Sequence, residues 1–251
     1  MTNTRKAGIL LPIFSLPSKY GVGSLGHCAY GFVDFLVRTG QSVWQILPIT
    51  ATAAIDEYSP YKSVCAFSGN YDLIDIDMLV GKGLVDWNFI NSVYQGYYQA
   101  DPRYADYAKA RSLKMIIFRE AFSNFDPKHD QAYKDFKKEN AFWLDDFAKY
   151  MALKEANDEK PYWEWPNPAN KPNPDTIDFH CFLQYLFFDQ WHQLKKYAND
   201  RGIEIFGDMP IYVSRDSSDF YYNRDMFLTD EKGEPHQISG VPPDEFSATG
   251  Q

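Results

Sequence analysis

A short stretch that runs from Ile203 to Ser214 constrains the fold most strongly. It begins as an apolar, β-favouring run just after Gly202, which is typical of a buried parallel strand that follows a helix. The run breaks at Gly207, and Asp208 follows it. Ligands of α/β proteins bind at the carboxyl ends of the strands, so Asp208 is a candidate binding residue. Asp is also common in turns, and a turn cap is at this point an equally good interpretation.

Two further strands are expected near the amino terminus. The segment from Gly8 to Leu11 is one, and the segment from Ser42 to Leu47, stopped by Pro48, is the other. Apolar residues recur at helical spacing between them, and Gly40 closes that pattern. The helical positions are Ala29, Phe32, Val33, Leu36 and Val37. A strand, a helix and a second strand predict a parallel pair.

The segment after the second strand carries two signals. Residues 50–70 are too long for a simple connection, and long loops at the ligand end of a sheet are usually functional. Apolar residues then alternate with Asp72, Asp75 and Asp77. We interpret the alternation as a half-exposed strand with its carboxylates in water. A calcium loop is disfavoured because its Gly and distal Glu are missing.

Residues 87–156 have a helical pattern that indicates an insertion and not another strand-helix repeat. The insertion ends in residues 160–175, which hold five prolines and predict loop or extended chain. Asp175 or Thr176 is expected to cap the next helix, which runs to about Asn199 before Gly202. Beyond the third strand we expect a hairpin near residues 230–233 and no fourth strand.

Composition and charge narrow the classes of function. The chain has 251 residues, of which 45% are hydrophobic and 24% charged, as in an ordinary globular protein. A net charge of -9 with scattered basic residues argues against a nucleic-acid partner. The apolar run from Ile9 to Ile13 is too short to span a membrane or to form a signal core. We therefore expect a cytoplasmic protein without a membrane partner.

The cysteines and histidines do not indicate a metal site. Cys28, Cys65 and Cys181 are odd in number and widely spaced, so we expect buried free thiols. The five histidines are equally dispersed. No spacing typical of zinc ligands results.

A glycine motif at residues 21–26 resembles a dinucleotide fingerprint, Gly-x-Gly-x-x-Gly. In that fold the strand leads directly into the first Gly, and an acidic residue follows about 20 positions later. Here two prolines separate the strand from Gly21, and no acid lies near Gln45. We reject a nucleotide cofactor and expect the glycines to shape a loop.

Carboxylate-catalysed cleavage of sugars is the reaction class that the sequence motifs do not exclude. No nucleophile elbow, phosphate loop or metalloprotease helix is present. Aromatic residues make up 17% of the chain, and their rings can stack on sugar faces, which is suggestive only. Glycosidic bonds are cut by two carboxylates, of which one attacks and the other protonates the leaving oxygen.

Four segments together resemble the amylomaltases, the 4-α-glucanotransferases of glycoside hydrolase family 77. Their order and spacing match across nearly the whole chain, and the combination is specific although no single piece is. The segments are Gly8 to Leu11 with Ser15-Leu16-Pro17 and Tyr20 to Gly26; Gly40 to Pro48 with Ser59-Pro60-Tyr61 and Ala66 to Asn70; Gly207 to Val213 with Asp216-Ser217; and Gly240 to Asp244 with Phe246-Ser247 and Gly250-Gln251.

The resemblance implies an α/β fold, a (β/α)8 TIM barrel with helical insertions, to which this chain contributes about three strands. Residues 1–251 would be the amino-terminal part of one catalytic barrel, with residues 85–175 as the insertion. The implied activity is retaining transfer of α-1,4-glucan segments between a maltooligosaccharide donor and acceptor, without a cofactor. Asp208 would hydrogen-bond the sugar beside the scissile bond, and residues 240–251 would form a lid over the acceptor side. The implied substrate-binding residues are Asp208, Tyr61, Ser59, Pro243, Asp244, Phe246 and Gln251.

The catalytic residues implied by the family are expected outside this chain. The nucleophile Asp, the acid/base Glu and a third Asp would follow Gln251, on later strands. Two details depart from the family pattern: Asp56-Glu57-Tyr58 looks rearranged, and Glu245 stands where some relatives have an aromatic residue. The alternative interpretation is a catalytically incomplete fragment or a glucan-binding relative. Hydrolysis in place of transfer is a third.

Overall fold

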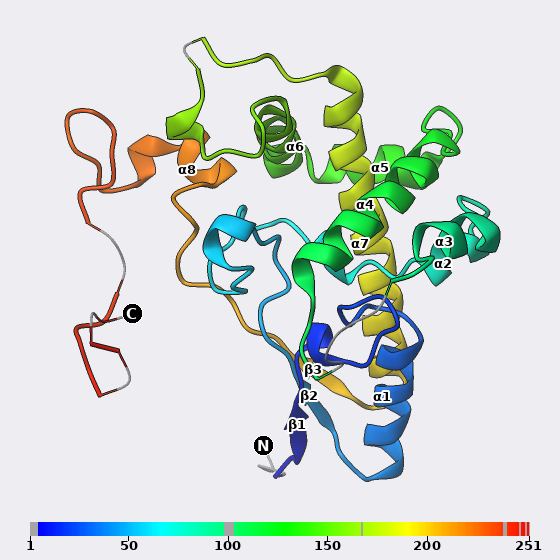
Figure 1. Ribbon diagram of the computed structural model, residues 1–251. Helices are drawn as coiled ribbons and strands as arrows, with labels where there is room; N and C mark the ends of the chain where they lie inside the picture. Colours follow the sequence, from blue (N-terminus) through cyan, green and yellow to red (C-terminus); the bar gives the residue numbers. More distant parts are fainter. Residues whose placement is uncertain are drawn as a thin grey trace.

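The computed structural model describes residues 5–97, 103–166, 168–237, 240–245, 247–248 and 250. Its sheet consists of three parallel strands in the order β1 (Gly8–Leu10), β2 (Val43–Gln45) and β3 (Glu204–Phe206). The three predicted strands and their parallel pairing are confirmed. The strands are shorter than predicted by one to three residues, although single backbone hydrogen bonds, such as that from the N–H of Leu11 to the carbonyl of Gln45, continue beyond their ends. Figure 1 shows the sheet at one end of the molecule, beside α1 and α7.

The two faces of the sheet have different environments. Ile9, Trp44 and Ile205 lie in register across the strands, and Trp44 is fully buried. The indole N–H of Trp44 donates to the carbonyl of Leu11 at 2.8 Å, so this polar group is satisfied in the core. On the opposite face Leu10 is 53% exposed and the aligned Phe206 is 62% exposed. One face is therefore packed and the other is open.

Helices α1 (His27–Arg38) and α7 (Pro174–Asp200) contact each other, and α7 contacts β3. Gly40, with φ of 70°, follows α1, and Gly202, with φ of 76°, follows α7, as the sequence predicts. The predicted cap of α7 is wrong by two to three residues. Asn173 is the N-cap and accepts from the backbone N–H of Asp175, because Pro174 is favoured at the first helical position.

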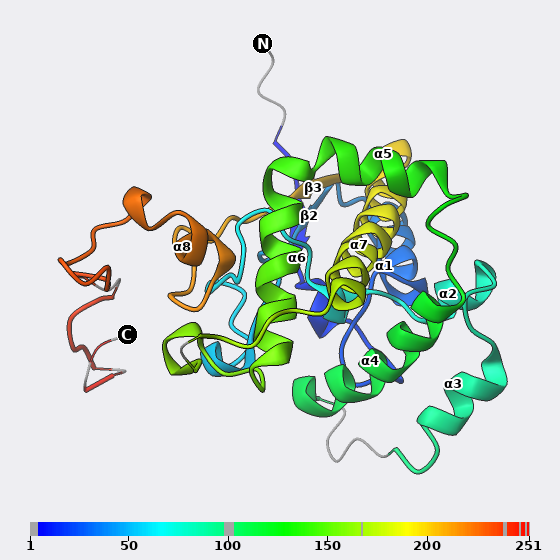
Figure 2. The same cartoon turned by 90° about the horizontal axis from the view of Figure 1, so that it is seen from above.

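The described part of residues 87–156 is mainly helical, as predicted. The α-helices described between β2 and α7 are α2 (Asp77–Gly81), α3 (Trp87–Val93), α4 (Tyr107–Ser123), α5 (Gln131–Glu139) and α6 (Ala141–Ala156). Figure 2 shows α6 between α8 (Ser218–Tyr222) on one side and α7 with α1 on the other. One buried cluster surrounds the sheet, α1 and α7, and a second surrounds α6.

The predicted half-exposed strand at residues 72–77 is wrong. A short 3₁₀ helix (Tyr71–Leu73) and the start of α2 occupy this segment, and Asp72 and Asp75 are buried. Two fully buried glutamines of α7 explain the difference, since their amides bond to the segment as a strand would. Gln184 accepts from the N–H of Gly69 at 2.7 Å and donates to its carbonyl at 3.0 Å. Gln190 does the same with Asp75, at 2.8 and 2.9 Å.

Two of the three carboxylates of this segment, those of Asp72 and Asp75, are buried against protein partners, whereas the side chain of Asp77 is 37% exposed. Asp72 forms an ion pair with Arg111, and Asp75 accepts from the hydroxyl of Ser24 at 2.7 Å. Asp75 also explains the glycine motif, because a Cβ on Gly26 would lie 1.9 Å from its carboxylate oxygen. A Cβ on Gly23 would lie 2.1 Å from the carbonyl of Ile13. The glycines shape a loop that packs against its neighbours, as predicted.

The burial of Lys114 is expected to make the stability of the fold depend on pH. It is buried in α4 and donates to the carbonyls of Asp72 and Ile74, and burial lowers its pKa to about 8. Above that pH the folded chain loses a proton that the unfolded chain keeps up to about pH 10.5, so stability should rise with pH. We expect Lys114→Met to remove up to roughly 3 kcal/mol of that rise in urea unfolding at pH 7.5 to 10.

Lys109 provides the control for this prediction, because it lies on the same helix with its side chain exposed. Lys109→Met should leave the slope of stability against pH as it is in the parent protein. An unchanged slope in Lys114→Met would contradict the assignment.

The segment after β3 contains the predicted hairpin. Thr229 and Pro235 form an antiparallel bridge around a turn in which Asp230 accepts from the N–H groups of Lys232 and Glu234. Cys65 and Cys181 are buried free thiols, whereas Cys28 is exposed, so the expectation of burial was wrong for Cys28. Within the described part of the chain, the helices are too short or too polar to cross a membrane.

Candidate functional site

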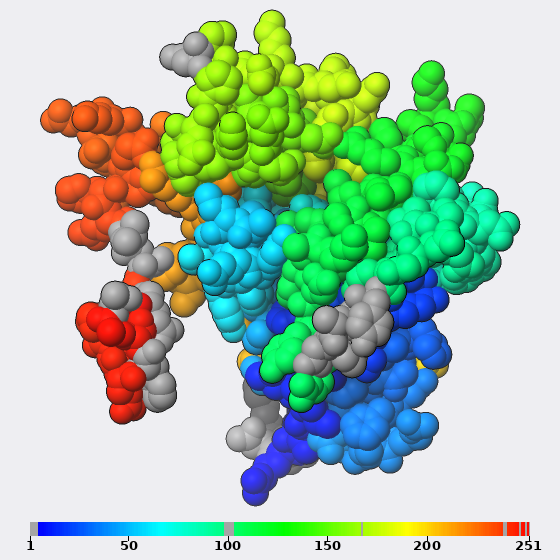
Figure 3. Space-filling view, viewed as in Figure 1, coloured from blue at the N-terminus to red at the C-terminus, as the bar shows by residue number. Residues whose placement is uncertain are grey.

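The loops that follow β2 and β3 start from the same edge of the sheet. The backbone N–H of Ile46 donates to the carbonyl of Phe206 at 3.0 Å, just before Pro48 and Gly207 end the two strands. Parallel strands place their carboxyl ends together, so both loops leave side by side. Figure 3 shows the loop after β2 in cyan, next to the loop after β3 in orange.

Tyr61, in the loop after β2, contacts Asp208, at the start of the loop after β3. The Tyr61 hydroxyl donates to Oδ2 of Asp208 at 2.9 Å, and the N–H of Met209 donates to Oδ1 at 2.8 Å. The hydrogen bond to Asp208 is the main cause of a raised pKa of Tyr61, since it holds the phenol proton. Tyr61 is 46% exposed and Asp208 is exposed, so both can reach a ligand.

Ser59 supports the position of Tyr61. Its hydroxyl accepts from the backbone N–H of Tyr61 at 3.3 Å, and its own N–H donates to the carbonyl of Asp56. Glu57 and Tyr58 just before it have φ of 55° and 57°, a left-handed conformation that is unfavourable for residues other than glycine.

Deeper in the molecule the two loops are joined by backbone hydrogen bonds. Ser63 and Val213 form a parallel bridge, and the N–H of Ser214 donates to the carbonyl of Ser63 at 2.8 Å. The N–H of Ser218 donates to the carbonyl of Val64 at 2.9 Å. Ser63, Val64, Ser214 and Ser218 are buried, so these bonds are shielded from water.

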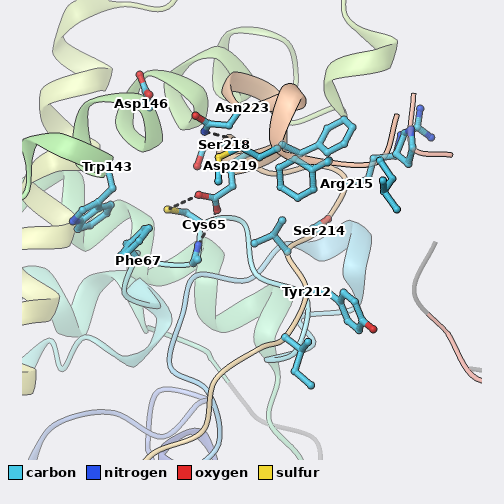
Figure 4. Close-up of a pocket in the computed structure, with 18 of the residues that line it drawn as sticks. Cys65, Phe67, Trp143, Asp146, Tyr212, Ser214, Arg215, Ser218, Asp219 and Asn223 are labelled. Carbon is cyan, nitrogen blue, oxygen red and sulfur yellow. Dashed lines mark hydrogen bonds between the residues drawn. The ribbon is translucent and has the colours of Figure 1, made fainter. Parts of the chain in front are cut away.

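A groove of about 770 Å³ lies beside this loop pair, between α6 and α8 (Figure 4). Exposed aromatic rings line part of it, among them Phe67 and Phe142, whose ring centres are 5.2 Å apart. Asp219 lies on its wall and accepts from the N–H of Ala66 at 2.8 Å. Burial raises the pKa of Asp219. Sequence reasoning did not single out this carboxylate, because it is one of several acids in a polar segment.

The predicted lid residues are not joined to the Tyr61–Asp208 pair by any hydrogen bond that the structure describes. Pro243 and Asp244 are exposed, and the N–H of Asp244 donates to the carbonyl of Ser247 at 3.0 Å. Figure 1 shows residues 240–245 to one side of α8 and away from the sheet. Phe246 and Gln251 lie outside the described residues.

The architecture defined above is an α/β fold of the amylomaltase kind. The amylomaltase from Streptococcus agalactiae in complex with acarbose matches with a TM-score of 0.87 and 38% identity, over 99% of this chain and 52% of that one. The amylomaltase from Corynebacterium glutamicum, at 19% identity and a TM-score of 0.76, shares the fold over 98% of this chain and 35% of that one.

Comparison of sequences shows which family the chain belongs to. The profile of the family described as 4-alpha-glucanotransferase matches residues 11–251, and the chain belongs to this family. The 4-alpha-glucanotransferase of Streptococcus pneumoniae serotype 4 is 45% identical over 98% of this chain and 50% of that protein. That of Aquifex aeolicus is 39% identical over 98% and 51%. The chain thus spans about half the length of the curated relatives it matches.

Proposed function

We propose that the complete protein is a 4-α-glucanotransferase that transfers α-1,4-glucan segments between maltooligosaccharides. The observation that carries the proposal is the Tyr61–Asp208 pair, which joins the loops that follow two parallel strands in a chain of this family. Both side chains are exposed and in direct contact. The Asp208 carboxylate can accept hydrogen bonds from sugar hydroxyls, and the Tyr61 ring can stack on the apolar face of a sugar. A cytoplasmic location is part of the same proposal.

In this proposal Asp208 accepts hydrogen bonds from the donor sugar, and Tyr61 and Ser59 shape the same subsite. Residues 240–251 form the acceptor-side lid, in which Pro243, Asp244, Phe246 and Gln251 contact the glucan. Residues 85–175 form an insertion in a (β/α)8 barrel. Three strands cannot close a barrel, so the remaining strands have to come from chain outside residues 1–251.

The bond-breaking carboxylates belong to that other part of the barrel. In a retaining transfer a carboxylate attacks the anomeric carbon, while an acid protonates the departing glycosidic oxygen. The acceptor hydroxyl then attacks the glycosyl-enzyme, and the former acid, now a base, takes its proton. The residues of this chain hold the donor sugar through both steps.

Maltotriose tests the proposed activity. We expect the protein expressed from its complete reading frame to convert maltotriose into glucose and longer oligosaccharides, resolved by anion-exchange chromatography. Products no longer than maltotriose would indicate hydrolysis, and an unchanged sugar would refute the proposal. The isolated segment of residues 1–251 should show no turnover, because it lacks the nucleophile and the acid. Turnover by that segment would refute the assignment of these two groups to the rest of the chain.

A further inference from the structure

Asp216 is a buried carboxylate that has no assigned role. It is 1% exposed and accepts hydrogen bonds from two side chains of α6, the ammonium group of Lys154 and the hydroxyl of Tyr150. The backbone N–H of Tyr162, just after α6, is a third donor at 3.3 Å. Lys154 is 3% exposed and Tyr150 is fully buried. Asp216 therefore connects the loop after β3 to the helical segment that precedes α7.

The same loop continues from Asp216 to the candidate site. The N–H of Asp216 donates to the hydroxyl of Ser214 at 3.1 Å, and Ser214 is bonded through its own N–H to Ser63. Ser63 lies two residues after Tyr61. A series of hydrogen bonds thus runs from α6 through Asp216 and Ser214 to Ser63, and the backbone continues from Ser63 to Tyr61.

A buried ion pair of this kind is weak evidence for stability alone. The cost of removing both charges from water offsets much of their attraction, and apolar replacements of such pairs are often neutral or stabilising. The pair does supply a fixed geometry, because the Asp216 carboxylate has to accept hydrogen bonds from both Lys154 and Tyr150 at the same time. Arg111 of α4 forms an ion pair with the buried Asp72 and donates to the hydroxyl of Thr52 at 3.3 Å, so the loop after β2 is held at a second point.

We propose that the Lys154–Asp216 pair, with Tyr150, is a positioning device through which α6 holds Tyr61 and Asp208 in hydrogen-bond contact for glucan binding. This inference rests on the proposed function for its glucan part only. It gives the helical insertion a role as the scaffold of the donor subsite. Lys154, Tyr150 and Asp216 contact no substrate in this role and act through the loops.

The first test needs no sugar. In the protein from the complete reading frame, labelled with [¹³Cζ]tyrosine, the pKa of Tyr61 is measured by NMR and assigned with Tyr61→Phe. Asp208→Ala gives the reference for a lost hydrogen bond. The double variant Lys154→Met/Asp216→Asn leaves no unpaired buried charge and should lower the pKa of Tyr61 to that reference value. Tyr150→Phe, which keeps the ring, should lower it part of the way.

The second test measures binding in a double-mutant cycle. Calorimetry with maltoheptaose should show that Tyr61→Phe weakens affinity about 2- to 10-fold in the parent protein, as expected for one hydrogen bond. In the Lys154→Met/Asp216→Asn background the same change should cost less than about 2-fold, because Tyr61 is no longer held in place. Additive effects would show that the pair acts on the whole fold and not on Tyr61.

The control is Lys196→Met/Asp200→Asn, the same two replacements in an exposed ion pair at the end of α7. It should leave both the pKa of Tyr61 and the affinity unchanged. If the pKa of Tyr61 stays raised in Lys154→Met/Asp216→Asn and in Tyr150→Phe, the positioning role is overturned. If that pKa falls but no glucan binds even to the parent protein, the positioning of Tyr61 stands and the proposed function fails.

Discussion

Replacing Asp208 by Asn is expected to lower kcat/KM for maltotriose about 10- to 100-fold in the complete protein. That range corresponds to the loss of a hydrogen bond to a charged group. Asp208 is exposed, and within the described residues its side chain forms hydrogen bonds with Tyr61 and Met209 only, so the fold should be unaffected. Glucose release gives the rate, and circular dichroism with a melting curve confirms that the variant folds.

Asp225 offers a matched control, since it is an exposed aspartate in the same part of the chain, on the 3₁₀ helix Arg224–Met226. Asp225→Asn makes the same change of charge and should keep the parent rate within twofold. Equal rates for Asp208→Asn and the parent protein would remove Asp208 from the donor subsite. Asp208 would then have only the role of a turn residue.

Gln184→Leu is expected to cause a large loss of stability although it leaves the net charge unchanged. The amide of Gln184 is fully buried and satisfies both the N–H and the carbonyl of Gly69. Leu has a similar volume but bonds to neither, so two buried backbone groups lose their partners. We expect the free energy of unfolding to fall by about 2 to 5 kcal/mol, measured by urea denaturation.

Gln193 provides the comparison on the same helix, because its side chain is exposed and bonds only to the neighbouring Asp189. Gln193→Leu should change stability by less than about 0.5 kcal/mol. A loss in Gln184→Leu no larger than that would mean that the loop around Gly69 finds other partners. The predicted destabilisation would then be wrong.

The three strands were predictable because their signals are local. Each is an apolar run that Pro or Gly ends, and each was placed within three residues of its observed bounds. The same local reasoning failed at residues 72–77. An alternating pattern shows which residues are polar. It does not show whether residues of distant helices, such as Gln190 or Arg111, bind those polar groups in the folded protein.

For the candidate site, too, the sequence indicated individual residues but not the contacts between them. Asp208 stood out from its place after an apolar run, and Tyr61 from the family resemblance. Neither signal predicted that the two side chains touch across 147 positions of sequence. Lys154 gave no signal at all, because a lysine within a helix usually indicates an exposed face and here lies in the core.

The sequence by itself determined the strands, the helical segment between them, the loop-forming glycines and membership of the family. These features depend on residue type, spacing and order, which are properties of the chain read locally. Only the tertiary structure decided which polar groups are buried together. The buried contacts of Gln184 with Gly69 and of Lys154 with Asp216 each join residues more than 60 positions apart. Partners so distant are selected by packing and by the cost of leaving a buried polar group unpaired.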